Sequence, residues 1–200
     1  MSKGFDLAIN LFLEHGGILK TAHAKKLGIN QNTLKRMLEA GLLTKVTRGV
    51  YRLASLSPLV QPDLVQVSIR IPASIVFLIS ALNFHNLTTQ IPGCVSIAVP
   101  MNVLAPHIDY PPIKVYRLSQ KTYSAGIEYH IIDGVTVRVY CREKTIADCF
   151  KFRNKIGGDI AIEALRDYLR QPKPDVPMLL EYARLDRVQK IIQPYLQAAI

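Results

Sequence analysis

Amide and cationic side chains fall on one side of a short segment, residues 31–39, if that segment is a helix. Each helical residue turns by about 100°, so five polar positions share a face: Gln31, Asn32, Lys35, Arg36 and Glu39. The opposite face carries Leu34, Met37 and Leu38. Gln and Asn can pair bidentately with adenine, and Arg and Lys with guanine, inside the DNA major groove, which admits a helix. The pattern is that of a base-reading helix, with an ordinary solvated helix face as the alternative.

Two helices are predicted before this segment. Gly16-Gly17 ends the first of them, which is indicated by apolar residues at helical spacing. Those apolar residues are Phe5, Ala8, Ile9, Phe12 and Leu13. Thr21 is expected to cap a short second helix over residues 22–27, whose outward face carries Lys25 and Lys26.

A glycine turn, Gly28-Ile29-Asn30, leads from the second helix into the amide-bearing one. Asn30 is suited to cap that third helix, which is expected to end near Ala40. The three helices and their tight turn predict a helix-turn-helix unit. Two short β-rich runs follow, residues 43–46 and 50–53, and they predict a hairpin around a glycine-containing turn.

This hairpin is basic, with Lys45, Arg48 and Arg52 expected on or near its tip. A basic hairpin directly after a helix-turn-helix predicts a winged helix-turn-helix, whose wing contacts phosphates or the minor groove. Residues 1–53 carry a net charge of +6, whereas the other 147 residues share +4 of the total of +10. The hairpin and this asymmetry favour DNA binding by the first quarter of the chain over the solvated-face alternative.

Ten side chains are predicted to contact double-stranded DNA. Base reading is assigned to Gln31, Asn32, Lys35 and Arg36. Contacts with phosphates or the minor groove are assigned to Lys25, Lys26, Lys45, Thr47 and Arg48. Thr33, on the same helix, completes the set.

Residues 16–53, GGILKTAHAKKLGINQNTLKRMLEAGLLTKVTRGVYRL, resemble the N-terminal domain of the AbiEi antitoxins of abortive-infection and type IV toxin–antitoxin systems. The resemblance is carried by the order of glycines, the turn LGI, the run TLKRMLEAG and the ending RGVYRL. Weaker similarity to the family's C-terminal region is found in residues 78–88, 96–100, 134–157 and 179–196. It implies a repressor that binds inverted repeats in its own promoter. It also implies a second domain that opposes a nucleotidyltransferase-like toxin, AbiEii, without needing a stable complex.

The remaining residues predict a second domain of mixed α/β type. A Ser/Pro-rich linker is expected at 54–63, between a domain at 1–53 and one at 64–200. Strands are predicted at 65–71, 95–99, 113–118, 127–132 and 135–140, the last two joined by an Asp133-Gly134 turn. Helices are predicted at 74–84, with Ser74 as cap, and at 144–155, 159–169, 178–183 and 186–199. The fold class is therefore α+β: a winged helix-turn-helix followed by a mixed sheet with C-terminal helices.

Basic residues of this second domain allow two interpretations. Lys144, Lys151 and Lys155 share one predicted helix face, preceded by Arg138 and Arg142. They form either a solvated face or a second surface for DNA phosphates or an RNA. Tyrosines in the predicted strands or near them could stack on bases, but are more often half-buried packing groups; they are Tyr123, Tyr129 and Tyr140.

Catalytic and metal-binding signatures are missing from the sequence: there is no HExxH, no Walker lysine loop and no GxSxG. We therefore expect no enzyme activity, no metal and no cofactor. Three widely spaced cysteines, Cys94, Cys141 and Cys149, fit reduced thiols in the cytoplasm, and no segment is long enough to span a membrane. The predicted function is that of a DNA-binding antitoxin. The alternatives are a stand-alone regulator with a ligand- or partner-sensing second domain, or a nucleic-acid-processing enzyme.

Overall fold

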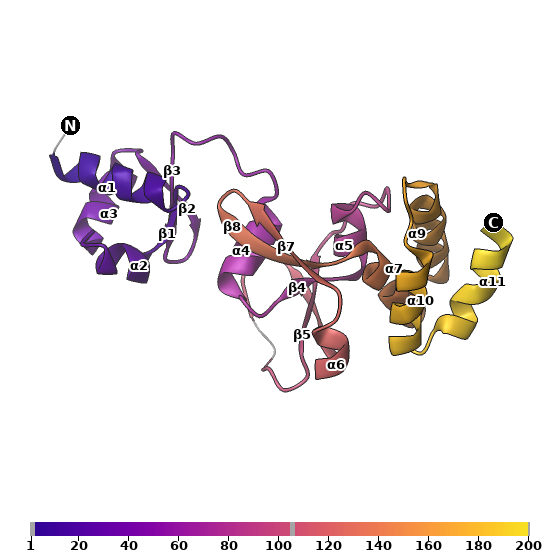
Figure 1. Cartoon of the computed structure of the whole chain (residues 1–200). Coiled ribbons are helices and arrows are strands. Elements are labelled where there is room, and N and C mark those ends of the chain that lie inside the picture. The colour runs from indigo at the N-terminus through magenta and orange to yellow at the C-terminus, as the bar shows by residue number, and fades with distance from the viewer. Residues whose placement is uncertain (1–2, 105–106, 200) are drawn as a thin grey trace. The chain divides into compact units, whose positions relative to one another are not determined.

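Two compact units make up the chain in the computed structural model, which describes residues 3–104 and 107–199 (Figure 1). Unit 1 comprises the chain up to Ile69 together with residues 131–136, and unit 2 comprises residues 70–130 and 137–200. The division after Ile69 comes later than the linker expected at 54–63. Residues 131–136, which unit 1 also includes, are the tip of a hairpin that is distant in sequence.

Three helices form the first part of unit 1: α1 (Lys3–Glu14), α2 (Thr21–Lys26) and α3 (Gln31–Glu39). Their shared core contains Phe12, Ala24 and Leu34, all almost completely buried. Ala8 and Phe12 of the predicted apolar stripe belong to this core, which confirms the period of the first helix. The predicted helix-turn-helix order of the elements is present, with Gly28 at a φ of 88° in the turn before α3.

A three-stranded antiparallel sheet completes this part of unit 1, in the order β1-β3-β2. Its strands are β1 (Ile18–Lys20), β2 (Leu43–Thr47) and β3 (Val50–Leu53). The predicted hairpin is therefore present, with an irregularity in register between Lys45 and Thr47. Sequence reasoning missed β1, because a three-residue strand carries too little pattern to be recognised.

Arg52 is a correction to the hairpin prediction. It lies near the end of β3 rather than near the tip, and its side chain is buried. Its guanidinium donates hydrogen bonds to the carbonyl oxygens of Leu56 (3.3 Å) and Ser57. Arg52 therefore holds the chain that leaves the hairpin and is not a surface cation.

The segment expected to be a strand at 65–71 is instead a helix, α4 (Pro62–Arg70). Apolar residues at alternate positions suggested a strand, but Pro62 and Asp63 in the first turn are helix-start signals. Val65 and Ile69, four residues apart, pack in one cluster with Val50 of β3. Tertiary packing of this helical face outweighs the local alternation.

A mixed five-stranded sheet lies in unit 2, except for the turn-side ends of β7 and β8, and has the order β6-β5-β4-β8-β7. The strands are β4 (Ile75–Val76), β5 (Val95–Pro100), β6 (Ile113–Leu118), β7 (Ile127–Ile132) and β8 (Val135–Tyr140). β4 pairs antiparallel with β5 and parallel with β8, while β5 and β6 are parallel. The predicted Asp133-Gly134 turn is confirmed, since both residues have positive φ, 50° and 77°. The helix expected from Ser74 begins only at Leu78 as α5 (Leu78–Phe84), because β4 occupies the residues before it.

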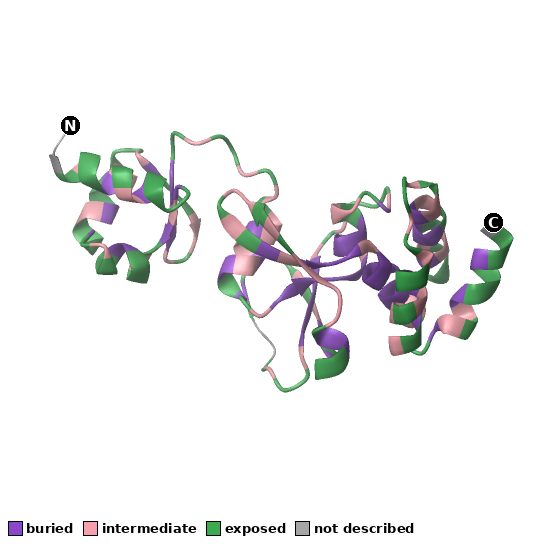
Figure 2. Ribbon diagram, viewed as in Figure 1, coloured by how far each residue is buried: buried purple, intermediate pink, exposed green. Residues whose placement is uncertain are grey.

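Helices pack around the central helix α7 (Arg142–Lys151), which is buried from Glu143 to Phe150 (Figure 2). The helices that contact it are α5, α8 (Arg153–Ile156), α9 (Gly158–Arg170), α10 (Val176–Leu185) and α11 (Gln189–Ala199). The short helix α6 (Gln120–Tyr123) contacts β5 instead. The predicted C-terminal helices are confirmed in approximate bounds, but the first of the four is divided into α7 and α8. Among residues 3–104 and 107–199, no helix combines the length and apolar character needed to cross a bilayer.

Candidate nucleic-acid interface

Helix α3 begins at a side-chain cap. Asn30 Oδ1 accepts hydrogen bonds from the backbone N–H of Thr33 (2.8 Å) and from its hydroxyl (3.1 Å). This confirms Asn30 as the predicted cap and satisfies one of the otherwise unpaired amides of the first turn. The hydroxyl hydrogen of Thr33 is therefore already used within the helix start.

The exposed and buried faces of α3 match the predicted division. Leu34 and Met37 are buried in the core of unit 1, 1% and 0% exposed. The exposed side chains are Gln31, Asn32, Lys35, Arg36 and Glu39. Lys35 Nζ lies 3.8 Å from Glu39 Oε1, but both side chains are mostly exposed, at 74% and 62%. Such an ion pair contributes roughly 0–1 kcal/mol, so Lys35 remains able to exchange Glu39 for another anion.

The Arg36 side chain of α3 contacts an aromatic ring of helix α1. Its guanidinium carbon lies 5.4 Å from the centroid of the Phe5 ring, which is a cation–π arrangement. Sequence reasoning took Phe5 only as part of the apolar stripe. Since Phe5 and Arg36 are 31 positions apart and on different helices, only the packing of α1 with α3 could show this contact.

The turn of the β2–β3 hairpin is bound to the start of α2. The backbone N–H and the hydroxyl of Thr21 both donate to the carbonyl oxygen of Gly49, at 2.8 and 3.1 Å. Thr21 is therefore not the cap of α2; Lys20 occupies that position without a side-chain hydrogen bond. The contact fixes the position of Gly49, and with it the neighbouring Arg48, relative to the helices.

The predicted contact residues differ in exposure. Eight are exposed: Lys25, Lys26, Gln31, Asn32, Lys35, Arg36, Lys45 and Arg48. Thr33 and Thr47 are half-buried. The structure thus presents eight of the ten side chains to solvent on α2, α3 and the hairpin of one compact unit. None of these eight is a buried packing residue, so all remain available to a ligand.

The second polyanion surface suggested for unit 2 is not formed by the lysines of α7. Lys144 is 0% exposed and its Nζ bonds to Asp148 Oδ1 (2.5 Å) and to Asp186 Oδ2 (3.3 Å). Lys151 Nζ lies 2.9 Å from Asp186 Oδ1. The prediction of a shared exposed lysine face is therefore wrong, because Lys144 is enclosed, Lys151 is half-buried against Asp186, and only Lys155 of the three is exposed.

Asp148 is the most deeply buried acid of this network. Desolvation raises the pKa of its carboxyl well above the usual range, and the nearby Lys144 ammonium opposes that rise. One carboxyl oxygen, Oδ2, has no hydrogen-bond partner within the described residues. The arrangement is structural: the carboxylates neutralise lysines that the helix packing places inside.

The tyrosines of this region are divided between packing and exposure. Tyr140 is buried and donates to the Tyr123 carbonyl at 2.8 Å, and Tyr123 is 7% exposed. Tyr129 is 66% exposed, with the Arg138 guanidinium 5.9 Å from its ring centroid. The packing interpretation is correct for Tyr123 and Tyr140, so neither is a platform for base stacking.

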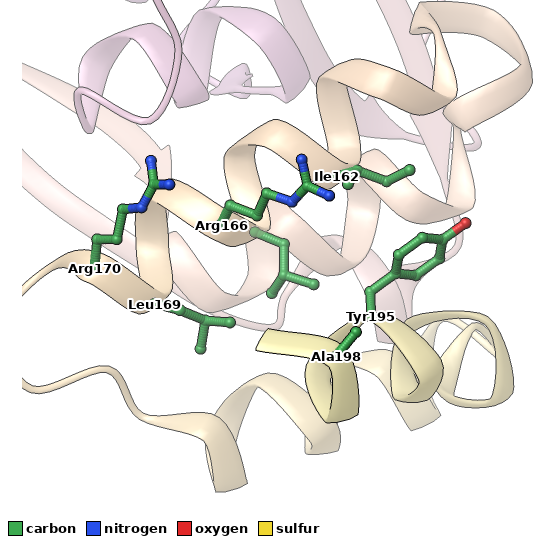
Figure 3. A pocket seen from close by; sticks show the side chains of 7 residues that line it. Ile162, Arg166, Leu169, Arg170, Tyr195 and Ala198 are labelled. Carbon is green, nitrogen blue, oxygen red and sulfur yellow. The ribbon is translucent and has the colours of Figure 1, made fainter. Parts of the chain in front are cut away.

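A cleft of about 280 Å³ lies between α9 and α11 in unit 2 (Figure 3). Leu169 and Ala198 contribute apolar lining, and Arg166 and Arg170 project from α9. Arg170 pairs with Asp167 at 3.3 Å. Across residues 3–104 and 107–199, no three His, Cys, Asp or Glu side chains are grouped as a metal site would require.

Comparison with known families identifies the N-terminal part of the chain. Residues 6–54 match the model of the family described as transcriptional regulator, AbiEi antitoxin. This range contains α2, α3 and the whole hairpin, together with most of α1. The match confirms the resemblance of the N-terminal region; it does not extend to unit 2. No curated protein matches the chain significantly.

Proposed function

We propose, on the premise that residues 6–54 are of the AbiEi transcriptional-regulator type, that this protein is a DNA-binding antitoxin of a type IV toxin–antitoxin system. It represses its own operon through a winged helix-turn-helix and counters a nucleotidyltransferase-like toxin through residues 64–200. The observation that carries the proposal is the coincidence of the family match with an exposed amide and cation face on α3.

In this proposal α3 enters the major groove. Gln31, Asn32, Lys35 and Arg36 read base edges, as bidentate amide and guanidinium pairs do. The Asn30 cap and the core residues on the opposite face support this role, since they hold the helix rigidly. Thr33 stays in the proposed surface beside them, with its hydroxyl hydrogen directed to Asn30.

The flanking cations are assigned to the DNA backbone. Lys25 and Lys26 of α2 contact phosphates, and the β2–β3 hairpin acts as the wing, with Lys45, Thr47 and Arg48 at phosphates or the minor groove. The Thr21–Gly49 contact supports this role because it positions the hairpin turn before DNA binds. The operator is expected to contain inverted repeats in the promoter of the protein's own operon.

The proposed compartment is the cytoplasm. Cys94, Cys141 and Cys149 are all free, and the last two are buried. Burial raises the pKa of the Cys141 thiol to about 11 and raises that of Cys149 well above its usual value. Both side chains are therefore protonated thiols of low reactivity, which suits a reducing compartment.

Fluorescence anisotropy with the full chain and labelled promoter DNA tests the proposal. The Lys35→Ala/Arg48→Ala variant should bind at least about tenfold more weakly, since two charge-assisted contacts are lost. Lys173→Ala/Lys190→Ala removes the same charge from exposed positions of unit 2 and should bind as the parent does. Equal weakening by both pairs, or none by the first, contradicts the assignment to α3 and the hairpin.

A further inference from the structure

A second cavity of unit 2, with a volume of about 380 Å³, is lined by cations from three helices. Lys121 comes from α6, Lys151 from α7 and Arg184 from α10, and Arg187 follows the end of α10. Ser119 and Thr122 add hydroxyl groups to the lining, and Leu185 and Asp186 complete it. The volume lies in the range of small-ligand pockets.

The charge of this lining is mostly uncompensated. Asp186 is its one carboxylate, and both oxygens are held by lysines: Oδ1 by Lys151 at 2.9 Å and Oδ2 by the buried Lys144 at 3.3 Å. Within the described residues, the side chains of Lys121 and Arg187 have no hydrogen-bond or ion-pair partner. The Nε of Arg184 donates to Gln189 Oε1 at 3.2 Å. Three cationic side chains therefore line the cavity without an opposing carboxylate.

An ordinary structural reason accounts for part of this arrangement. Cations at the end of a helix are stabilised by the helix dipole, which explains Arg184 and Arg187 at the end of α10. The dipole of α10 does not explain the position of Lys121, which belongs to another helix and lines the same cavity. Like charges brought into one pocket repel one another, so their convergence favours an anionic ligand.

We propose that this cavity binds the diphosphate or triphosphate group of a small ligand, as carried by a nucleoside triphosphate or by pyrophosphate. Arginine matches phosphate oxygens with two parallel hydrogen bonds, and lysine supplies a point charge. Several cations require several negative charges, which a polyphosphate has and a single carboxylate lacks. Among the described residues, no aromatic side chain lines the cavity, so recognition is directed at the phosphates rather than at a base. The inference stands independently of the proposed action against a toxin.

The backbone at Arg187 allows a substitution that removes a cation without harming the fold. Arg187 has a φ of 62°, in the left-handed region that favours glycine, and directly follows Asp186, the C-cap of α10. Arg187→Gly should therefore fold at least as well as the parent protein. Combined with Lys121→Gln, an exposed position, it removes two of the three uncompensated charges.

Isothermal titration calorimetry of the full chain at low salt tests the proposal, with pyrophosphate and ATP as probes. The Lys121→Gln/Arg187→Gly variant should raise the Kd for both probes by about tenfold or more. Lys173→Gln/Lys190→Gln, which removes two exposed charges elsewhere in unit 2, should change it less than about twofold. Lys35→Ala/Arg48→Ala should also leave it unchanged, because these residues belong to unit 1.

The two probes distinguish the source of the phosphate. Binding of ATP and pyrophosphate with similar affinity places recognition in the phosphates, as proposed. The site is overturned if neither ATP nor pyrophosphate shows saturable binding. It is also overturned if Lys121→Gln/Arg187→Gly binds these probes as the parent protein does. A short single-stranded RNA or a random DNA duplex bound through Lys121 and Arg187, with no binding of the small phosphates, also overturns it in favour of a nucleic-acid surface. None of these results depends on promoter binding, so failure here leaves the proposed function to its own test.

Discussion

Thr21 donates both its backbone N–H and its hydroxyl hydrogen to the carbonyl oxygen of Gly49, so the start of α2 and the turn of the β2–β3 hairpin form one bonded unit. The hairpin is thereby fixed to the helices before any ligand is present. The backbone at Gly49, next to Arg48, is therefore already in position. If the hairpin binds DNA as proposed, a turn held in this way reduces the entropy lost on binding.

Thr21→Val should weaken this connection while keeping the size of the side chain. The hydroxyl bond is lost and the backbone bond to Gly49 remains, so the free energy of unfolding should fall by about 0.5–1.5 kcal/mol. Urea unfolding measures the change. Thr21→Ser keeps the hydroxyl and serves as the control. Loss of the same stability in both variants would show that the hydrogen bond is not the cause.

Arg36 and Arg48 should affect DNA binding differently. Arg36→Ala removes a proposed guanine contact worth about 1–3 kcal/mol and should lower the ratio of operator affinity to random-DNA affinity. Arg36→Lys keeps the charge but loses the bidentate geometry and the planar contact with Phe5, so it should also lower this ratio. Arg48→Ala should lower both affinities. It should also reduce the slope of log affinity against log salt concentration by about one unit. A salt series with both duplexes measures these effects, and identical behaviour of the two alanine variants contradicts the division of roles.

Action against a toxin should survive the loss of operator recognition. The proposal assigns that action to residues 64–200, whereas Lys35 and Arg36 belong to α3. Co-expression of a cognate toxin with the Lys35→Ala/Arg36→Ala variant should therefore still restore growth. If this variant folds, as judged by its circular dichroism spectrum, and growth is not restored, repression alone is the protective activity.

The buried Asp148 should make stability depend on pH. Its folded-state pKa is raised by burial above the unfolded value, so its contribution is fully present below the unfolded pKa and is lost as the pH rises through the folded pKa. Urea unfolding at several pH values from about 4 upward, compared with Asp148→Asn, isolates the effect. The parent protein should gain stability relative to the variant as the pH falls. The opposite trend would mean that Lys144 lowers the pKa more than burial raises it.

The local part of the candidate site could be predicted from the sequence. The two faces of α3, its Asn30 cap and the hairpin follow from spacing and residue type within short continuous segments. The contacts of Arg36 with Phe5 and of Thr21 with Gly49 could not, because they join distant elements. The DNA contacts assigned to α3 and the hairpin stay predictions.

Unit 2 shows where local reasoning failed. Lys144 looked like one cation on a helix face, but α7 became the central helix, so Lys144 is enclosed with Asp148 and Asp186. Asp186 lies 42 positions away, and no local pattern pairs it with Lys144. In unit 1, the strand predicted from the alternating residues 65–71 was wrong for a similar reason, because packing against Val50 favours the helix α4.

Base reading by α3 is tested most directly by a change that removes no charge. Gln31→Ala/Asn32→Ala truncates two exposed amides beyond the Asn30 cap. In anisotropy measurements with the full chain, operator affinity should fall by about tenfold or more, since each base contact is worth about 1–3 kcal/mol, while affinity for a random duplex stays the same. Unchanged operator affinity, or an equal loss on both duplexes, would contradict the assignment of α3 as the helix that reads the operator.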